Sequence, residues 1–574
     1  QDYNRNEKRT YEALVTGVFC GIFNFSKKRH KKVCKLHRDD PVAVRQLEVI
    51  RGLLREADGA ITATDTSREG QLVARNLYGY LGFKGKTERL WLPSLTDKAI
   101  REAFCDLRPD SLYEGLYLAG RARREADRII GYNASLALGM AAGKKNHSLG
   151  RVQTPVLALI SRRYLENRDF TAVPYYRLEL SVLKEGKELV FTCPEKYTRR
   201  EDAVAARNRI PASRVTTIIQ VERKETVEEP PLLYDLASLQ KEANLRTGLT
   251  AGQTASILQR LYEEGYISYP RTSCRHIRED MQEKMPALLS LLKDNPRLAR
   301  HAEALEGKAL STHAADDGKV SGHHAIIITE SVPGKLPLDE QIIYWMIAGR
   351  MLEAFSDACT GEEVNVSLEC GGIRFGAGYR RRVHAGWKSV YGEAGKEEDT
   401  VFPSWEPDEV LPVTDISVRS VETSPEPLFT EASLLSEMEK RGLGTPSTRA
   451  GVIELLIARR YVERRGCNLL PTPKGLEVYE TVKDKLIAAP DMTARWEKDL
   501  QEIERGGLDA DVFIQKIEEY ARQIVEELSE VRFEHPEPPR HRCPKCGMET
   551  LTLHRKVARC SDPDCAFLLF RMFN

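Results

Sequence analysis

Features that would assign a class at once are missing from the sequence. It has no apolar run long enough to cross a membrane, which takes about 20 residues, and no signal-peptide pattern. It has no GxxxxGK[ST] phosphate loop either, so nothing in it indicates the use of ATP. We therefore expect neither a membrane-spanning helix nor an ATPase of the phosphate-loop class.

An excess of charge is also missing, since 86 basic and 85 acidic residues leave a net charge of +1. A polyanionic partner would therefore have to be held by local basic patches. With 574 residues, 41% of them hydrophobic and 30% charged, the chain should form about three to five globular domains. Most of the 12 cysteines are scattered, as expected for reduced thiols in the cytosol.

The stretch with the clearest chemistry is residues 265–273, GYISYPRTS. Residues 250–262 before it have helical spacing, Gly265 should end that helix, and Pro270 prevents a new one from starting through Tyr269. Tyr269 is thus presented on a short extended segment near Arg271. A tyrosine that attacks a phosphodiester needs such a cation, because charge builds on the phosphoryl oxygens. The same residues also fit a half-buried strand tyrosine that hydrogen-bonds through its hydroxyl.

Asp65 stands where an expected strand, residues 59–65, meets a loop and then a helix over residues 72–81. A carboxylate at such a junction of an α/β sheet is a usual ligand of a divalent metal, and Glu69 could face the same point. Asp65 could equally be the N-cap of the helix. Residues 90–92 indicate a second strand with Arg89 at its start, in an α/β unit that ends near residue 110.

Two further segments carry hydrogen-bond donors suited to a phosphate backbone. In the helical stretch 111–170, Arg124 and Arg128 are four residues apart and share a face, and the loop SLGRVQTP precedes another helix. A second glycine-rich turn, GLGTPSTR, has the same character and contains Thr448 and Arg449. A plain capped loop is the alternative interpretation of SLGRVQTP.

Strand alternation in residues 174–233 and again in 361–425 flanks a helical stretch that contains Tyr269. Neither β segment is a large sheet alone, so we expect the two to complete one domain. The helical insertion would project from it as a detachable lobe, which is what a gate needs. His323 lies in this lobe; a histidine is usually structural, but one near a phosphodiester could donate or bind a proton.

Four cysteines near the end of the chain form two pairs, Cys543 with Cys546 and Cys560 with Cys565. Two pairs with tight internal spacing are a strong signature of tetrahedral Zn²⁺. We predict a structural zinc ribbon that a proline-rich linker, residues 534–540, separates from the body.

Taken together, the motifs resemble those of type IA DNA topoisomerases, closest to the topoisomerase III branch. ATDTSREG, SLGRVQTP, YISYPRTS, HHAI and GLGTPSTR occur in the family's order, and the resemblance covers roughly residues 45–530. It implies a multidomain fold of α/β, α and β parts: a toprim-like α/β unit, helical DNA-binding and gate lobes that form a toroid around a split β domain, and a C-terminal zinc ribbon. The expected domains are 1–110 (toprim-like), 111–173 and 426–533 (helical DNA-binding), 174–233 and 361–425 (β), 234–360 (gate lobe) and 541–574 (zinc ribbon).

The resemblance also implies a mechanism that needs no ATP. Tyr269 would attack one strand and become joined to its 5′ phosphate while the 3′ hydroxyl stays bound. The gate lobe would swing away, another strand or a duplex would pass, and the 3′ hydroxyl would then reseal the break. Arg271 would stabilise the phosphoryl charge and His323 would assist near the scissile phosphate. Arg89 would support the site, and Glu69 would serve as acid or base at the 3′ oxygen.

By the same resemblance, the substrates would be single-stranded and negatively supercoiled DNA, to be relaxed or decatenated. A helicase or a single-strand-binding protein is a candidate partner, and we expect a monomer in the cytoplasm, associated with the nucleoid. The residues expected to grip DNA are Ser148, Leu149, Gly150, Arg151, Val152, Gln153, Arg124, Arg128, Thr448 and Arg449.

The chain departs from the family's ATDxDREGE pattern at two positions, where Ser67 replaces the second aspartate and Gln71 the closing glutamate. The family's first strand, with its lysine and acidic residue, has no match near residue 1. Asp65 remains, and Glu69 could share a Mg²⁺ with it. We therefore predict weak Mg²⁺ binding and expect religation to be more impaired than cleavage.

Two other functions stay open on the sequence. The reduced acidic cluster favours a catalytically impaired protein of the same fold that holds single-stranded nucleic acid without cutting it, whereas the intact Tyr269 and Arg271 argue against it. A metal-dependent primase or nuclease could share the α/β unit. That class would leave the tyrosine segment and the gate-like insertion unexplained.

Overall fold

The computed structural model describes residues 41–92, 97–142, 147–210, 215–320, 323–391, 403–531, 540–553, 557–560, 562, 564, 565 and 567–570. The expectations about a first strand near residue 1 and about the linker up to residue 539 fall outside these ranges.

The N-terminal α/β unit has a three-stranded sheet in the order β1–β2–β3. Strand β2 is parallel to β1 and antiparallel to β3. Its elements are α3 (Pro41–Glu56), β1 (Gly59–Thr62), α4 (Arg68–Leu81), β2 (Lys86–Arg89), α5 (Asp97–Cys105) and β3 (Arg108–Pro109). The expected strand over residues 90–92 is wrong. Arg89 ends β2 instead of beginning it, because the chain then leaves the sheet and Trp91 stacks on Tyr113 with ring centroids 5.4 Å apart.

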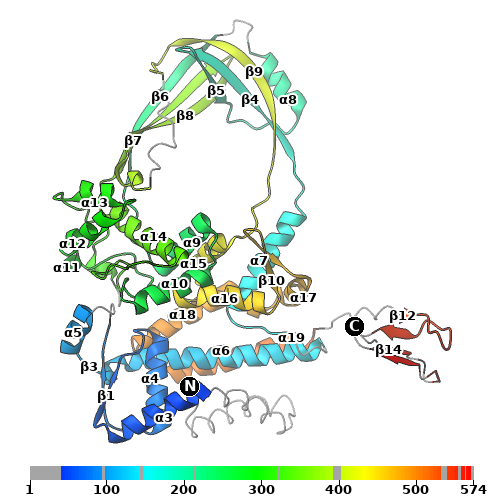
Figure 1. Ribbon diagram of the computed structural model, residues 1–574. Helices are drawn as coiled ribbons and strands as arrows, with labels where there is room; N and C mark the ends of the chain where they lie inside the picture. The colour runs from blue at the N-terminus through cyan, green and yellow to red at the C-terminus, as the bar shows by residue number, and fades with distance from the viewer. Residues whose placement is uncertain are drawn as a thin grey trace.

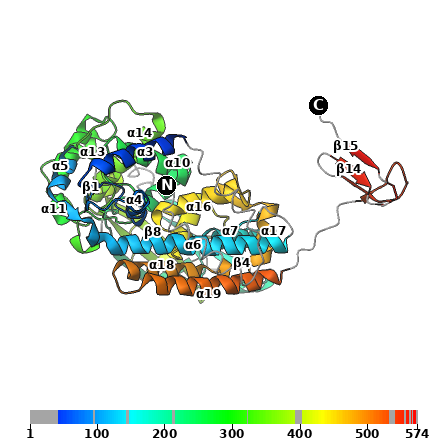
Figure 2. The same cartoon turned by 90° about the horizontal axis from the view of Figure 1, so that it is seen from below.

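Two groups of helices, far apart in sequence, share one hydrophobic core and form the helical body. They are α6 (Glu114–Ala141) and α7 (Gln153–Arg168), then α15 (Glu431–Lys440), α16 (Pro446–Ala458), α17 (Pro473–Val482), α18 (Pro490–Glu504) and α19 (Ala510–Ser529), with the hairpin β10 (Val462–Arg465) and β11 (Asn468–Pro471). The long helix α6 runs beside α18 and α19 (Figure 2). Small residues permit this approach: a Cβ on Gly115 would lie 2.2 Å from the carbonyl oxygen of Glu504.

Six strands close a barrel in the order β4–β5–β8–β7–β6–β9. They are β4 (Pro174–Lys184), β5 (Lys187–Thr192), β6 (Val215–Glu228), β7 (Cys359–Cys370), β8 (Ile373–His384) and β9 (Val410–Glu422). Alternate residues of β4, such as Leu178 and Leu180, point into the barrel core, as strand alternation requires. The alternation gave no sign of α8 (Arg200–Asn208), which packs on β4 and β9.

The chain between β6 and β7 forms a helical lobe with its own hydrophobic core, called the gate lobe below after its expected role. Its helices are α9 (Leu236–Thr247), α10 (Ala251–Glu263), α11 (Glu279–Gln282), α12 (Met285–Ser290), α13 (Ala299–Leu305) and α14 (Leu338–Ala354). The expected helix before Tyr269 is α10. Thr250 caps it in a box with Gln253, and Gly265, with a φ of 78°, turns the chain out of it.

Figure 1 shows these parts arranged in a ring, with the barrel opposite the α/β unit and the helical body, and the gate lobe along one side. A four-stranded antiparallel sheet lies apart from the ring in both views (Figures 1 and 2). It consists of β12 (Arg540–His541), β13 (Leu551–Leu553), β14 (Val557–Cys560) and β15 (Leu568–Phe570). Among the residues described, no helix has the length and apolar character that crossing a membrane requires.

Candidate active site

Tyr269 lies where the gate lobe meets the α/β unit. The segment that carries it is fixed within the lobe, because the Ser268 amide donates to Ile327 O at 2.9 Å and the Ser268 hydroxyl donates to Ala325 O at 3.0 Å. Tyr269 is 3% exposed, and its buried hydroxyl has no partner at full hydrogen-bonding geometry within the described part of the chain, although the Ser67 side chain is close enough to lower its pKa. The alternative of a strand tyrosine that bonds through its hydroxyl therefore does not match the structure. A buried, unpaired hydroxyl calls for a functional explanation.

The electrostatic surroundings of Tyr269 oppose its ionisation when no DNA is present. Burial raises the pKa of the phenol well above its ordinary value, and the negative charge of Asp65 raises it further. Arg271 acts in the opposite direction. Its guanidinium lies 3.6 Å from the carboxylate of Asp65, across the boundary between the two parts. Both side chains are partly exposed, at 45% for Arg271 and 39% for Asp65, so a phosphate could reach this ion pair.

His323 joins the gate lobe to the α/β unit. Its Nε2 lies 3.0 Å from the carbonyl oxygen of Thr66 and also contacts the Thr66 hydroxyl. The ring lies against Tyr269, with centroids 4.3 Å apart, and stacks on Trp91 at 5.6 Å. Burial lowers the pKa of His323 below its ordinary value, so the ring is neutral near pH 7. Sequence reasoning missed Thr66 and Trp91; the position of Trp91 just after a strand end was the available signal.

Arg89 supports the site through the backbone. It is fully buried, and it donates hydrogen bonds to Thr64 O at 2.8 Å and to Asp65 O at 2.6 Å. Burial lowers its pKa. These bonds fix the loop that presents Asp65. Gly70 allows the loop to fold tightly, since a Cβ there would lie 2.0 Å from the carbonyl oxygen of Asp65.

Ser67 and Gln71, the two departures from the family pattern, each make a hydrogen bond that stabilises the local structure. The Ser67 hydroxyl accepts from the Gly70 amide at 3.1 Å and caps α4, so the alternative that Asp65 caps this helix is wrong. The Gln71 amide donates to the buried carboxylate of Asp110 at 2.8 Å. A glutamate at position 71 would set two buried carboxylates side by side, which is unfavourable.

The remaining acidic residues offer a poor site for Mg²⁺. Asp65 faces Arg271, and Glu69 accepts from the Arg123 guanidinium at 2.8 Å. Each carboxylate thus already has a cationic partner, and the Ser67 hydroxyl is used as a cap. Mg²⁺ prefers an octahedral set of oxygen ligands, and the described residues supply no third carboxylate here. The residues present do not fit a tight magnesium site.

The residues expected to grip DNA fall into two groups. Arg124 and Arg128 lie on an exposed face of α6. Arg151 is instead buried between Asp127, at 2.6 Å, and Glu497, at 3.2 Å. Arg151 therefore holds the helical body together in this closed state.

The neighbours of Arg151 in the SLGRVQTP loop are also engaged within the protein. Leu149 was expected to contact DNA. Its side chain instead lies in the hydrophobic core, and its amide donates to Ser135 Oγ at 2.9 Å. The buried Gln153 donates to Ser148 Oγ at 3.1 Å, and Tyr461 bonds the Ser148 backbone. Gly150 and Val152 lie in the same loop and are partly exposed.

In the GLGTPSTR turn, Thr448 and Thr445 form the capping box of α16. Arg449 is buried, lies 3.6 Å from Glu439 and has a pKa lowered by burial. Gly444, with a φ of 71°, brings this turn against Val152 of the SLGRVQTP loop. The two glycine-rich segments are thus neighbours, although about 300 residues of chain separate them.

The four C-terminal cysteines come together as the sequence predicts. The sulfur atoms of Cys543, Cys546, Cys560 and Cys565 all lie within 4.8 Å of one another. Cys543 Sγ is 3.6 Å from Cys565 Sγ, and Cys546 Sγ is 3.8 Å from Cys560 Sγ. Four converging thiols are the ligand set of a structural Zn²⁺ site, so the residues present fit this ion.

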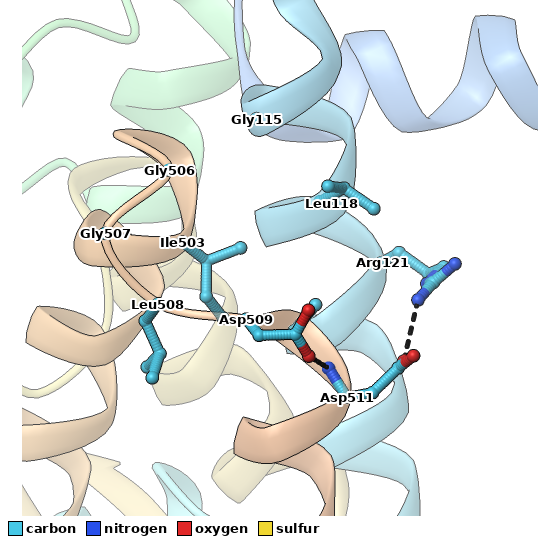
Figure 3. Close-up of a pocket in the computed structure, with 10 residues that line it drawn as sticks. Gly115, Leu118, Arg121, Ile503, Gly506, Gly507, Leu508, Asp509 and Asp511 are labelled. Atoms are coloured by element: carbon cyan, nitrogen blue, oxygen red, sulfur yellow. Dashed lines mark hydrogen bonds and ion pairs between the residues drawn. The ribbon is translucent and has the colours of Figure 1, made fainter.

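One pocket, with a volume of about 390 Å³, lies away from Tyr269 between α6 and the turn that joins α18 to α19 (Figure 3). Its charged groups are engaged within the protein. Asp509 caps α19, and Asp511 lies 3.2 Å from Arg121. None of the residues discussed above as reactive lines this pocket, so the site at Tyr269 remains the candidate for chemistry.

Known proteins resemble this chain in sequence and in fold. Residues 111–515 match the family model described as DNA topoisomerase. DNA topoisomerase 3 of Bacillus subtilis is 34% identical over 549 residues, which cover 89% of this chain and 75% of that protein. DNA topoisomerase 3 of Bacillus licheniformis is 33% identical over 559 residues, which cover 91% and 76%. The solved structure of full-length topoisomerase I from Thermotoga maritima matches with a TM-score of 0.70 at 25% identity, over 92% of this chain and 88% of that one.

These findings confirm the expected fold class and do not favour a protein that only binds nucleic acid. The family model covers most of the chain, and the relatives are matched over three quarters of their length. The chain therefore belongs to the type IA DNA topoisomerases and is similar to their topoisomerase III branch.

Proposed function

We propose that Tyr269 is the nucleophile with which this topoisomerase cleaves and reseals one DNA strand. The observation that carries the proposal is the buried, unpaired Tyr269 hydroxyl, which lies against His323 where the gate lobe meets the α/β unit. A covalent bond formed at this boundary would join the DNA end to the part of the molecule that must move. The missing phosphate loop agrees with this chemistry, since transesterification conserves the energy of the phosphodiester.

In cleavage, the bond between Tyr269 Oη and phosphorus forms while the bond from phosphorus to the 3′ oxygen breaks. The phenol loses its proton and the 3′ oxygen gains one. Arg271 supports the step because the scissile phosphate would replace Asp65 as the partner of its guanidinium. The positive charge of Arg271 would then lie near both the phenol and the phosphoryl oxygens. His323 is neutral and lies against the phenol ring, but its Nε2 bonds Thr66 and neither ring nitrogen bonds the Tyr269 hydroxyl here. We propose that His323 takes the proton that Tyr269 loses once bound DNA brings a ring nitrogen, or a water between them, within reach of that hydroxyl.

The other site residues act from the side of the α/β unit. Glu69 is half exposed and paired with Arg123, and we assign it as the acid or base at the 3′ oxygen. Arg89 holds the loop of Asp65 and acts as a positioning residue. Arg124 and Arg128 offer an exposed basic face to the phosphate backbone. The buried Arg151 and Arg449 would reach DNA only after a rearrangement of their ion pairs.

Type IA topoisomerases typically use Mg²⁺, but the carboxylates described here do not fit a tight site for it. We therefore route no step through this ion and propose that Mg²⁺ binding is weak. Zn²⁺ would be held by the four cysteine thiolates and would supply a structural crosslink of the C-terminal sheet.

We further propose single-stranded and negatively supercoiled DNA as substrates, and the domain limits given above. We also propose that the protein is a monomer, that it lies in the cytoplasm with the nucleoid, and that it works with a helicase or a single-strand-binding protein.

Cleavage of a labelled single-stranded oligonucleotide, stopped by a denaturing quench, tests the function. With a label at the 3′ end, we expect the fragment downstream of the break to be linked to the native chain through its 5′ phosphate. We expect no linked fragment with Tyr269→Phe, which keeps the ring and removes the hydroxyl. An equal amount of adduct with the variant would overturn the assignment of Tyr269. Tight binding of the oligonucleotide without any adduct would instead favour a protein that only holds DNA.

A further inference from the structure

The helix that leads to Tyr269 begins in a contact with the helical body. At its C-terminal end, α10 passes through Gly265 to the reactive segment. At its first residue, the Ala251 amide donates a hydrogen bond to Glu431 Oε2 at 2.8 Å. Glu431 belongs to α15 of the helical body, and both residues are buried, at 1% exposure for Ala251 and 4% for Glu431. A carboxylate of one part of the molecule thus caps a helix of another.

The chemistry of this contact favours a charged acceptor. The first amides of a helix have no partner within it and carry the positive end of the helix dipole, so a carboxylate there is stabilised. The capping box of Thr250 and Gln253 satisfies local donors, and the Ala251 amide is left for Glu431. Hydrogen bonds to an ionised acceptor are about twice as strong as neutral ones.

Glu431 belongs to a cluster of ion-paired side chains in the helical body, called the seat below because the first turn of α10 lies against it. Arg464 of β10 donates to Glu431 Oε1 at 2.6 Å, and its other nitrogen donates to Glu454 of α16 at 2.6 Å. Glu454 also faces α10, since a Cβ on Gly252 would lie 3.1 Å from its Oε1. The seat, defined as Glu431, Glu454 and Arg464, therefore receives the first turn of α10, and Glu431 keeps a cationic partner when that helix is absent.

A second contact joins the lobe to the same helix of the body. Lys241 of α9 lies 2.5 Å from Glu439 of α15, and α9 packs along α15. These contacts are separate from the boundary at Tyr269, where the lobe meets the α/β unit through Thr66, Trp91 and Asp65. A lobe that swings away after cleavage must break both sets of contacts. Among those with the helical body, the buried hydrogen bond of Glu431 is the one that holds the backbone of α10, the helix that leads to Tyr269.

We propose that Glu431 is a positioning residue that holds the gate closed by capping α10 and returns Tyr269 to its place for resealing. The inference rests on the gate reaction proposed above and names a residue that controls it. Glu431 acts through α10 and does not touch the reacting atoms.

Glu431→Gln tests the proposal, with Glu437→Gln as the matched control. Gln keeps the size of the side chain but loses the charge. Glu437 is a carboxylate of the same helix, and its partner Arg441 is the residue that follows that helix. Two substrates separate a gate effect from general damage. A short single-stranded oligonucleotide can be cleaved while the gate stays closed. Strand passage in a negatively supercoiled plasmid requires the gate to open, and the break cannot be resealed until the gate closes again.

For Glu431→Gln we expect adduct on the oligonucleotide to stay within about twofold of the native level. Adduct on the plasmid should rise roughly tenfold, which corresponds to replacing a charge-assisted hydrogen bond by a neutral one. Hydrogen exchange in the first turn of α10 should accelerate by a similar factor, and Glu437→Gln should change neither readout. Equal plasmid adduct for the two variants, or a parallel fall on both substrates, would overturn the proposal.

Ala251→Pro provides a second variant from the side of the lobe. Proline is well accepted at the first position of a helix. It removes the donor and sets its ring Cδ where the amide proton pointed at Glu431 Oε2, so it breaks the bond and pushes the carboxylate away. We expect the same selective rise in plasmid adduct, and this variant decides the matter if Glu431→Gln fails to fold by circular dichroism. If the native chain forms a Tyr269-dependent adduct but neither variant changes the plasmid result, the proposal for Glu431 alone fails.

Discussion

At the scale of single residues, burial raises the pKa of Tyr269 most, and the ion pair of Asp65 with Arg271 modifies it. The charge of Asp65 raises the pKa of Tyr269, and Arg271 lowers it. Asp65→Asn removes the unfavourable charge and frees Arg271, so the phenol should ionise more easily. We predict that the alkaline limb of the cleavage rate against pH moves to lower pH, with a several-fold faster rate near pH 7 on a short oligonucleotide.

Glu437→Gln serves as the control for that experiment, because Glu437 of the helical body pairs with Arg441 and is absent from the groups that shift the pKa of Tyr269. It should leave the position of the alkaline limb unchanged. An unmoved limb in Asp65→Asn would show that Asp65 has no influence on the phenol.

The position of Ser67 gives a second prediction. Aspartate and serine are equally good N-caps, so Ser67→Asp should keep α4 stable to within about 0.5 kcal/mol while it adds a carboxylate between Asp65 and Glu69. We expect Mg²⁺ affinity, measured by titration calorimetry, to increase at least about tenfold, because Mg²⁺ prefers oxygen ligands of this kind. The same affinity in both chains would mean that Mg²⁺ is held elsewhere.

The sequence was sufficient for residues whose role lies in a local motif, and insufficient for those whose partners are remote. Tyr269, Asp65 and His323 were chosen from short motifs, and the structure brings them together. Arg151 was expected to face DNA, but its partner Glu497 lies 346 residues away, and no local pattern reveals that burial. The role of each candidate in the reaction stays a prediction.

At the scale of elements, local signals fixed some helices and strands, and tertiary contacts decided others. The helical spacing of residues 250–262 and the turn at Gly265 defined α10 from the sequence. β2 lies earlier than expected because the charged residues Lys86–Arg89 pair with β1. Their polar character hides a strand that is stabilised by its backbone bonds and by the burial of Arg89.

The C-terminal sheet gives the prediction that belongs to this scale. Its small buried cluster consists mostly of the four cysteines, so the sheet has little apolar core of its own. Removal of metal by a chelator should therefore unfold residues 540–570 and leave the thermal transition of the ring unchanged. Differential scanning calorimetry together with hydrogen exchange would detect this, and an intact sheet after complete removal of metal would contradict it.

At the scale of the whole molecule, the closed ring depends on a neutral His323 between two parts. Burial lowers the pKa of His323 in the closed state, whereas an open gate would expose the ring and restore its ordinary pKa of about 6.5. The open state therefore binds a proton more readily, and closure is favoured above that pKa and weakened as pH falls below it. Asp65 and Arg89 also act on this ring, with opposite signs.

We predict that acidification from pH 7.5 to 5.5 increases opening of the gate several-fold. The measurement is a lower protection factor against hydrogen exchange in residues 65–70 and 323–328, taken relative to the intrinsic exchange rate at each pH. His323→Asn, which cannot titrate, should remove most of this dependence on pH. An equal dependence in the variant would assign the effect to other groups.

The account as a whole depends on a covalent bond between Tyr269 and the 5′ end of a broken strand. Mass spectrometry of peptides from the denatured adduct tests it most directly. We predict that the peptide containing Tyr269 carries the mass of a 5′-phosphorylated nucleotide and that no other tyrosine does. A nucleotide on a different residue, or no modified peptide from a sample that has cut its DNA, would contradict the account.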